Sequence, residues 1–159
     1  MGNDIFVDEN PIVLFSKAEK NIAAINSFLK DKDVPEKTHY DSICYNVTQA
    51  VEKYLKGFIV ANNGKVKKIH NLDRIIEIAE SLNNNFSNIK NECIYLSNYT
   101  SEIRYSNKFK IEKHEITEIL KHLGNVYNFE PLKNMRKAFQ KENDYINLPE
   151  FDFLNNKQI

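Results

Sequence analysis

The residues best suited to chemistry lie along one line of the segment 38–61. They recur every three or four positions, which places them on one face of a helix. These residues are Tyr45, Gln49, Glu52 and Lys56, with Lys53 beside them. Glu52 and Lys56 have the spacing and order of a favourable surface ion pair. The line is therefore either a solvated helix face or a seam between two subunits.

Two further candidates follow later in the chain. His70 precedes a helix start, where it either pins the loop by a hydrogen bond or contacts a ligand. Arg104 ends an apolar helical pattern and is followed by Tyr105. An arginine there either satisfies the last helix carbonyls or, facing a cleft, binds phosphate bidentately. The next histidine, His114, is separated from Arg104 by nine residues.

Motifs for several other chemistries are missing from the sequence. The histidines His39, His70, His114 and His122 have no Cys, Asp or Glu at zinc-like spacing, so we expect no metal and no cofactor. The chain contains neither the G-x-S-x-G nucleophile motif nor a glycine-rich phosphate loop. Cys44 and Cys93 lack motif spacing and predict buried thiols in a reducing compartment.

Length and charge limit the class of protein further. With 159 residues, the chain suits one domain with a substantial core. Its 22 basic and 22 acidic residues balance, so no overall field attracts nucleic acid or membrane. No apolar run approaches the length of a membrane span, and the polar, acidic start does not resemble a signal peptide. We therefore expect a cytoplasmic protein.

Helical periodicity dominates the chain and predicts an all-α fold. Apolar residues spaced by three and four form a stripe along the segment 38–61, the longest regular helix. The other predicted helices cover 11–30, 72–82, about 87–104, about 112–128 and about 132–142. We expect an up-and-down bundle of four or five helices in a single domain, 1–142, with a short C-terminal helix. An irregular tail, 143–159, follows.

Helix-end signals support these boundaries. Asn10 followed by Pro11 predicts a capped start, and Asn71 is expected to cap the helix from Leu72. Asn63 and Gly64 are expected to supply positive φ after the central helix.

Three short motifs together resemble the HEPN domain family. The segment 49–56, QAVEKYLK, resembles the Q-A-x-E-K-x-L-K core of these domains. The segment 69–72, IHNL, is similar to the family's T-H-D-L-like helix entry. The segment 104–106, RYS, resembles its R-Y-P-like ending of the fourth helix. Their order and spacing match over about residues 11–128.

The resemblance implies a helical bundle that forms a homodimer, with polar residues of both subunits lining a cleft. Family members often pair with a minimal nucleotidyltransferase in bacterial two-gene modules of toxin–antitoxin type. Some are metal-independent ribonucleases with an R-x(4–6)-H motif, in which arginine steadies phosphate and histidine acts as general base. Here the spacing from Arg104 to His114 is longer than that motif.

Three hypotheses follow from these observations. The first is a homodimer that binds nucleotide or RNA phosphate and acts with a nucleotidyltransferase. The residues expected to bind the ligand are Arg104, Tyr105, His70, Lys53 and Gln49. The second is a metal-independent endoribonuclease toxin with Arg104 and His114 as catalytic residues. The third is a dimerisation or protein-interaction module without catalysis.

Overall fold

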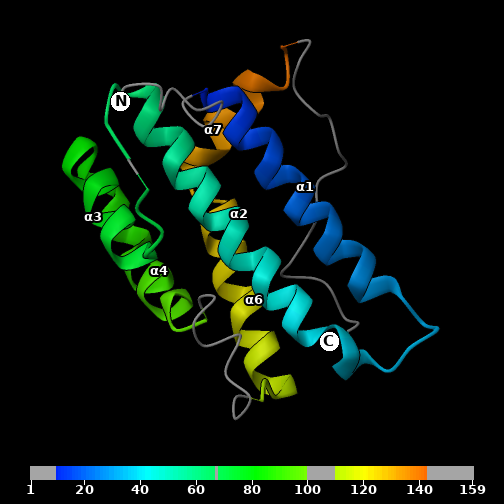
Figure 1. Ribbon diagram of the computed structural model, residues 1–159. Helices are drawn as coiled ribbons and strands as arrows, with labels where there is room; N and C mark the ends of the chain where they lie inside the picture. Colours follow the sequence, from blue (N-terminus) through cyan, green and yellow to red (C-terminus); the bar gives the residue numbers. More distant parts are fainter. Residues whose placement is uncertain (1–9, 67, 100–109, 143–159) are drawn as a thin grey trace.

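The structure is a computed structural model, and it describes residues 10–66, 68–99 and 110–142 (Figure 1). These residues form an all-α fold, as predicted. The α-helices are α1 (Pro11–Lys30), α2 (Tyr40–Ala61), α3 (Leu72–Leu82), α4 (Lys90–Ser97), α6 (Lys113–Tyr127) and α7 (Glu130–Phe139). Two 3₁₀ helices, η2 (Glu36–His39) and η3 (Asn84–Ile89), lead into α2 and α4. The expected tail, 143–159, lies outside the described residues.

Most helix ends follow their sequence signals. The Asn10 side chain accepts hydrogen bonds from the backbone N–H groups of Ile12 and Val13, which confirms the capped start of α1. Asn71 occupies the N-cap of α3, but its side chain makes no capping bond, contrary to our expectation. Its backbone carbonyl accepts from the N–H of Arg74 instead.

The end of α2 differs in detail from the prediction. Asn63 has a φ of 64°, whereas Gly64 has no positive φ. The N–H of Gly64 donates to the carbonyl of Ile59 over 2.8 Å, and that of Asn63 donates to Val60 over 3.0 Å. These two bonds form a Schellman motif with asparagine in the left-handed position. Glycine follows because a Cβ there would come within 2.6 Å of Ile59 Cγ2.

Two predicted helix starts differ from the structure, one by three residues and one by two. The fourth α-helix begins at Lys90 rather than near position 87, because η3 precedes it. Phe86 and Ile89 are both buried in η3, and their spacing of three residues fits the 3₁₀ period. The α-helix α4 ends at Ser97, and the rest of the predicted helix lies beyond the described residues. The last helix, α7, already begins at Glu130, with Pro131 in its first turn.

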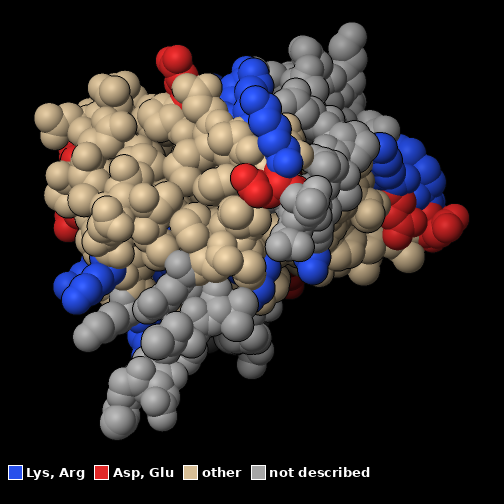
Figure 2. Space-filling view, turned by 90° about the horizontal axis from the view of Figure 1, so that it is seen from above, with Lys and Arg blue, Asp and Glu red and all other residues tan. Residues whose placement is uncertain are grey.

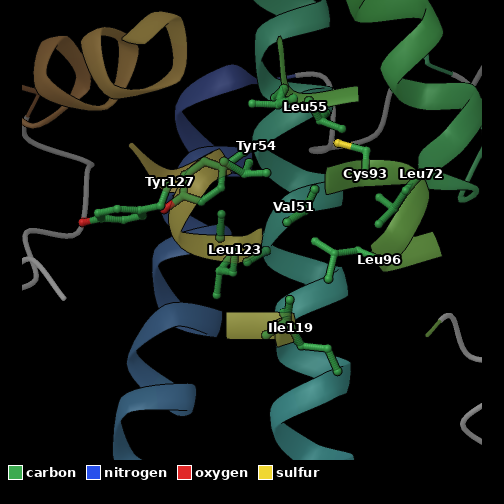
Figure 3. Packing of buried hydrophobic residues seen from close by; sticks show 14 of the residues in the cluster. Val51, Tyr54, Leu55, Leu72, Cys93, Leu96, Ile119, Leu123 and Tyr127 are labelled. Carbon is green, nitrogen blue, oxygen red and sulfur yellow. The ribbon is translucent and has the colours of Figure 1, made fainter. Parts of the chain in front are cut away.

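Helix α2 is the centre of the bundle. It packs against α1 on one side and against α3 and α4 on the other, with α6 behind it (Figure 1). Figure 3 shows how Val51, Tyr54 and Leu55 of α2 meet the neighbouring helices. The partners labelled there are Leu72 of α3, Cys93 and Leu96 of α4, and Ile119, Leu123 and Tyr127 of α6. Among the described residues, no helix is long and apolar enough to cross a membrane.

A glycine allows α1 and α2 to approach closely. A Cβ at Gly57 would lie 2.5 Å from Cδ1 of Phe15. The Phe15 ring is fully buried and is fixed by edge contacts with Tyr54 and Phe139, at centroid distances of 5.1 and 5.2 Å. The ring therefore has little room to move away from an added methyl group.

Arg136 of α7 belongs to the interior of the protein. It is 1% exposed and its guanidinium lies 3.7 Å from the centroid of the Tyr127 ring. Its Nη1 donates to the Tyr127 carbonyl over 3.1 Å, and its Nε lies 3.7 Å from Oε1 of Glu19. Arg136 therefore ties α7 to α6 and α1, so it is a structural arginine.

We predict that Gly57→Ala destabilises the protein by about 1–3 kcal/mol, because overpacking at Phe15 outweighs the higher helix propensity of alanine. Urea unfolding of the variant measures this change. The cost should shrink in a Phe15→Leu background, since the smaller side chain relieves the contact. An equal cost in both backgrounds would contradict the proposed clash.

Both cysteines should be unreactive while the protein is folded. Cys44 and Cys93 are buried, as predicted, and burial raises the pKa of the Cys93 thiol from 9.0 to about 12. A thiol reagent at neutral pH should detect none in the native protein and two in denaturant. Because only the unfolded thiol ionises just above pH 9.0, Cys93 should also lower the stability as the pH rises further. Rapid labelling of the native protein would contradict this burial.

Candidate functional site

The polar side chains of α2 form a continuous strip along the helix. We define the polar strip by its members, which are Ser42, Tyr45, Asn46, Gln49, Glu52, Lys53 and Lys56. At 3.6 residues per turn these positions span roughly 120° of the helix surface. One edge of the strip faces α1, and the other faces the loop before α3, because each edge has a hydrogen-bonded partner there.

The edge beside α1 is a chain of amides that ends in a lysine. Lys53 Nζ donates to Oδ1 of Asn21 over 3.0 Å, and Asn21 Nδ2 donates to Oδ1 of Asn46 over 2.9 Å. Asn46 Nδ2 in turn donates to the Ser42 carbonyl over 2.8 Å. The ammonium group of Lys53, one of the expected ligand residues, is thus held against α1.

The other edge is centred on the carboxylate of Glu52. Its Oε2 accepts a hydrogen bond from Lys56 Nζ over 2.9 Å and lies 3.0 Å from Nδ1 of His70. The side chains of Glu52 and Lys56 are only 11% and 13% exposed, whereas that of His70 is 70% exposed. The expected ion pair exists, but it is largely buried rather than solvated. His70 pins its loop by a hydrogen bond, one of the two predicted alternatives.

Gln49 lies between the two edges. It is half-buried, and its amide makes no hydrogen bond to the part of the chain that the structure describes. A primary amide offers two donors and an acceptor, so it can contact a phosphate oxygen or a base edge. Of the expected ligand residues, the structure thus brings Gln49, Lys53 and His70 to one helix face. Arg104 and Tyr105 lie outside the described residues.

His114 is located at a different level of the bundle. It is exposed in the first turn of α6, next to Lys113, whose Nζ is 3.9 Å from Oε2 of Glu36. Glu36 belongs to η2, immediately before α2, whereas Glu52 lies twelve residues into α2, or about 18 Å along its axis. Within one subunit, His114 is therefore remote from Glu52 and His70.

The described residues on either side of the segment 100–109 are linked by hydrogen bonds. The Tyr99 hydroxyl donates to Oε1 of Glu115 over 2.8 Å, and Oε2 of Glu115 accepts from the backbone N–H of Glu112 over 2.8 Å. Burial, together with hydrogen bonds to Tyr95 and Glu115, raises the pKa of Tyr99 well above 10. The residues that flank the segment 100–109 are thus tied to each other.

Two polar features were not singled out from the sequence. Asn21 was not selected, because nothing on α1 indicates that it faces α2. His122 was assigned no role, yet its Nδ1 lies 3.4 Å from Oε2 of Glu92, and its ring lies 4.3 Å from that of Tyr95. These partners come from separate helices, so only the packing of the helices reveals them.

The fold and the polar strip together describe a class of all-α bundles whose central helix carries a polar face. Comparison with known families identifies the particular class. The profile of the HEPN domain matches residues 13–135, which cover most of the chain. The protein therefore belongs to the HEPN domain family, as the three short motifs suggested. Searches of curated proteins and of solved structures gave no significant match.

We predict that Tyr99→Phe lowers the stability by about 1–2 kcal/mol, because the variant loses a hydrogen bond to a carboxylate at a largely buried position. Urea unfolding measures the change. Thr117→Ala serves as control, since its exposed hydroxyl bonds only within its own helix, and it should stay within about 0.5 kcal/mol. If both variants lost the same stability, the hydrogen bond between Tyr99 and Glu115 would contribute no more than that of an exposed hydroxyl.

Proposed function

We propose that the protein is a HEPN homodimer that binds nucleotide or RNA phosphate in a cleft lined by the polar strips of both subunits. The observation that carries this proposal is the strip itself. A merely solvated helix face would leave its charged side chains in water, but Glu52 and Lys56 are largely buried and hydrogen-bonded. Such an ordered polar face suits recognition, because its side chains are held before a ligand arrives.

The expected roles follow from the chemistry of the side chains. The Gln49 amide contacts a base or phosphate oxygen, and Lys53 supplies a fixed positive charge. Arg104, with Tyr105, is the expected bidentate phosphate contact. The end of the bundle in Figure 2 shows Lys and Arg interspersed with Asp and Glu, separated by wide areas of other residues. Because the 22 basic and 22 acidic residues of the chain balance, affinity is expected from these local contacts rather than from a broad basic surface.

A protein partner belongs to the same proposal. We infer that the chain acts with a minimal nucleotidyltransferase in a module of toxin–antitoxin type, because this pairing is common in the family to which it belongs. The nine residues between Arg104 and His114 exceed the R-x(4–6)-H spacing, so we favour phosphate binding over catalysis by these two residues.

We predict that Arg104→Ala weakens binding of a labelled oligoribonucleotide by about 10- to 100-fold, the range expected for losing hydrogen bonds to a charged group. Fluorescence anisotropy at fixed salt measures the affinity. The matched control is Arg74→Ala, which removes an exposed arginine of α3 that makes no hydrogen bond or ion pair with the described residues of the strip.

Equal affinities for Arg104→Ala and the parent protein would refute the role of Arg104. Light scattering on the same samples measures the oligomeric state. If the RNA-binding species proved to be a monomer, the two-subunit cleft would be wrong even though RNA binding stood.

A further inference from the structure

We propose that Asn21 of α1 is a positioning residue for the ligand site. It holds the ammonium group of Lys53 where a phosphate of the ligand binds, and Asn46 holds Asn21 in turn. This inference rests on the proposed function, because it assumes that a phosphate lies on the polar strip. It adds a second helix to the site, since the expected ligand residues Gln49 and Lys53 both belong to α2.

The hydrogen bonds of this chain of side chains have one direction, which both of its ends impose. The Ser42 carbonyl can only accept, so Nδ2 of Asn46 faces it and Oδ1 of Asn46 faces Asn21. The ammonium group of Lys53 can only donate, so Oδ1 of Asn21 faces it, over 3.0 Å. Nδ2 of Asn21 then donates to Asn46, over 2.9 Å. Neither amide can turn over without placing two donors or two acceptors face to face.

The chain lies between two closely packed helices. Asn46 and Lys53 are seven residues apart, or about two turns, so they lie on one face of α2, and Asn21 of α1 contacts both. All three residues are half-buried. Ile22 follows Asn21 and Val47 follows Asn46, and both of these apolar residues are buried in the core. The packing of α1 on α2 therefore fixes the position of Asn21 relative to Lys53.

An amide can hold an ammonium group without offsetting its charge. The second lysine of the strip, Lys56, donates over 2.9 Å to the carboxylate of Glu52, which does offset its charge. The bond from Lys53 to Asn21 has a similar length but a neutral acceptor, and it uses one of the three donors of the ammonium group. This bond therefore orders the Lys53 side chain and leaves its attraction for a phosphate in place.

Ordering Lys53 before the ligand arrives raises the affinity. A lysine side chain in water has many rotamers, and binding an anion restricts them at a cost in free energy. The bond to Asn21 already restricts them in the unbound protein. For one such side chain, the cost corresponds to a change in affinity of about 3- to 10-fold. Asn21 thus changes how tightly the phosphate binds without touching it.

The test measures binding of a labelled single-stranded oligoribonucleotide of mixed sequence to the full chain at several salt concentrations. Lys53→Met should weaken binding. It should also make the plot of log affinity against log salt shallower by about 0.7, the value for one phosphate contact on a single strand. Asn21→Ala should weaken binding by about 3- to 10-fold but keep the slope of the parent protein, because the charge of Lys53 remains.

A double variant separates positioning from support of the fold. If Asn21 acts through Lys53, Asn21→Ala should cause no further loss of affinity in the Lys53→Met background. A loss of equal size in both backgrounds would overturn the proposal, since Asn21 would then act independently of Lys53. The matched control is Asn125→Ala, because Asn125 also joins two helices, donating to Oε2 of Glu92 over 3.1 Å. This control should bind RNA like the parent protein.

Asn21→Asp changes the charge while it keeps the acceptor. The new carboxylate still accepts from Lys53 but offsets its charge, so this variant should show the weaker binding and the shallower slope of Lys53→Met. An affinity and a slope like those of the parent protein would contradict a contact between Lys53 and a phosphate.

Two further comparisons identify the source of the phosphate and separate this inference from the proposed function. Fluorescently labelled ATP is titrated against the same variants, and the ligand whose binding responds to them is the one whose phosphate Lys53 contacts. RNA binding that is weakened by Arg104→Ala but by neither Lys53→Met nor Asn21→Ala would overturn this inference and leave the proposed function in place. If the parent protein bound neither RNA nor ATP, both would be overturned.

Discussion

The bundle depends on the contacts that surround α2. This helix packs against α1, α3, α4, α6 and α7, so its apolar stripe forms the centre of a single core. Gly57 lets α1 approach at Phe15, and the Schellman turn at Asn63 directs the chain back toward α3. A helix so enclosed has only one face left for polar side chains, and that face becomes the polar strip.

Burial then decides how the strip is built. Polar groups with little access to water need hydrogen-bond partners, and a charged group needs them most. Glu52 meets this need through Lys56 and His70, and Lys53 meets it through Asn21. The same bonds that make burial tolerable also hold an imidazole and an ammonium group in fixed positions. The bonds that stabilise the buried carboxylate therefore also fix side chains to which we assign ligand binding.

Helix existence and type could be predicted because they follow from local patterns. The apolar period of 3.6 residues, the Asn10 cap and Pro11 all act within one or two turns of the chain. The prediction failed at 84–89. There a 3₁₀ helix that buries Phe86 and Ile89 takes the place of the expected first turn of the α-helix. Asn71 correctly predicted the start of α3, but its side chain does not make the expected capping bond. The N–H of Arg74 donates to the backbone carbonyl of Asn71 instead.

By itself, the sequence determined the all-α class, the central helix, the polar line on it and the resemblance to the HEPN family, because each of these follows from residue patterns within short segments. The tertiary structure decided which members of that line share partners. Glu52 and His70 are eighteen residues apart, and Lys53 and Asn21 thirty-two, so no helical period relates them. Only the packing of α1 and of the loop before α3 against α2 brings them within hydrogen-bonding distance. The packing of α6 places His114 near the N-terminal end of α2, away from Glu52.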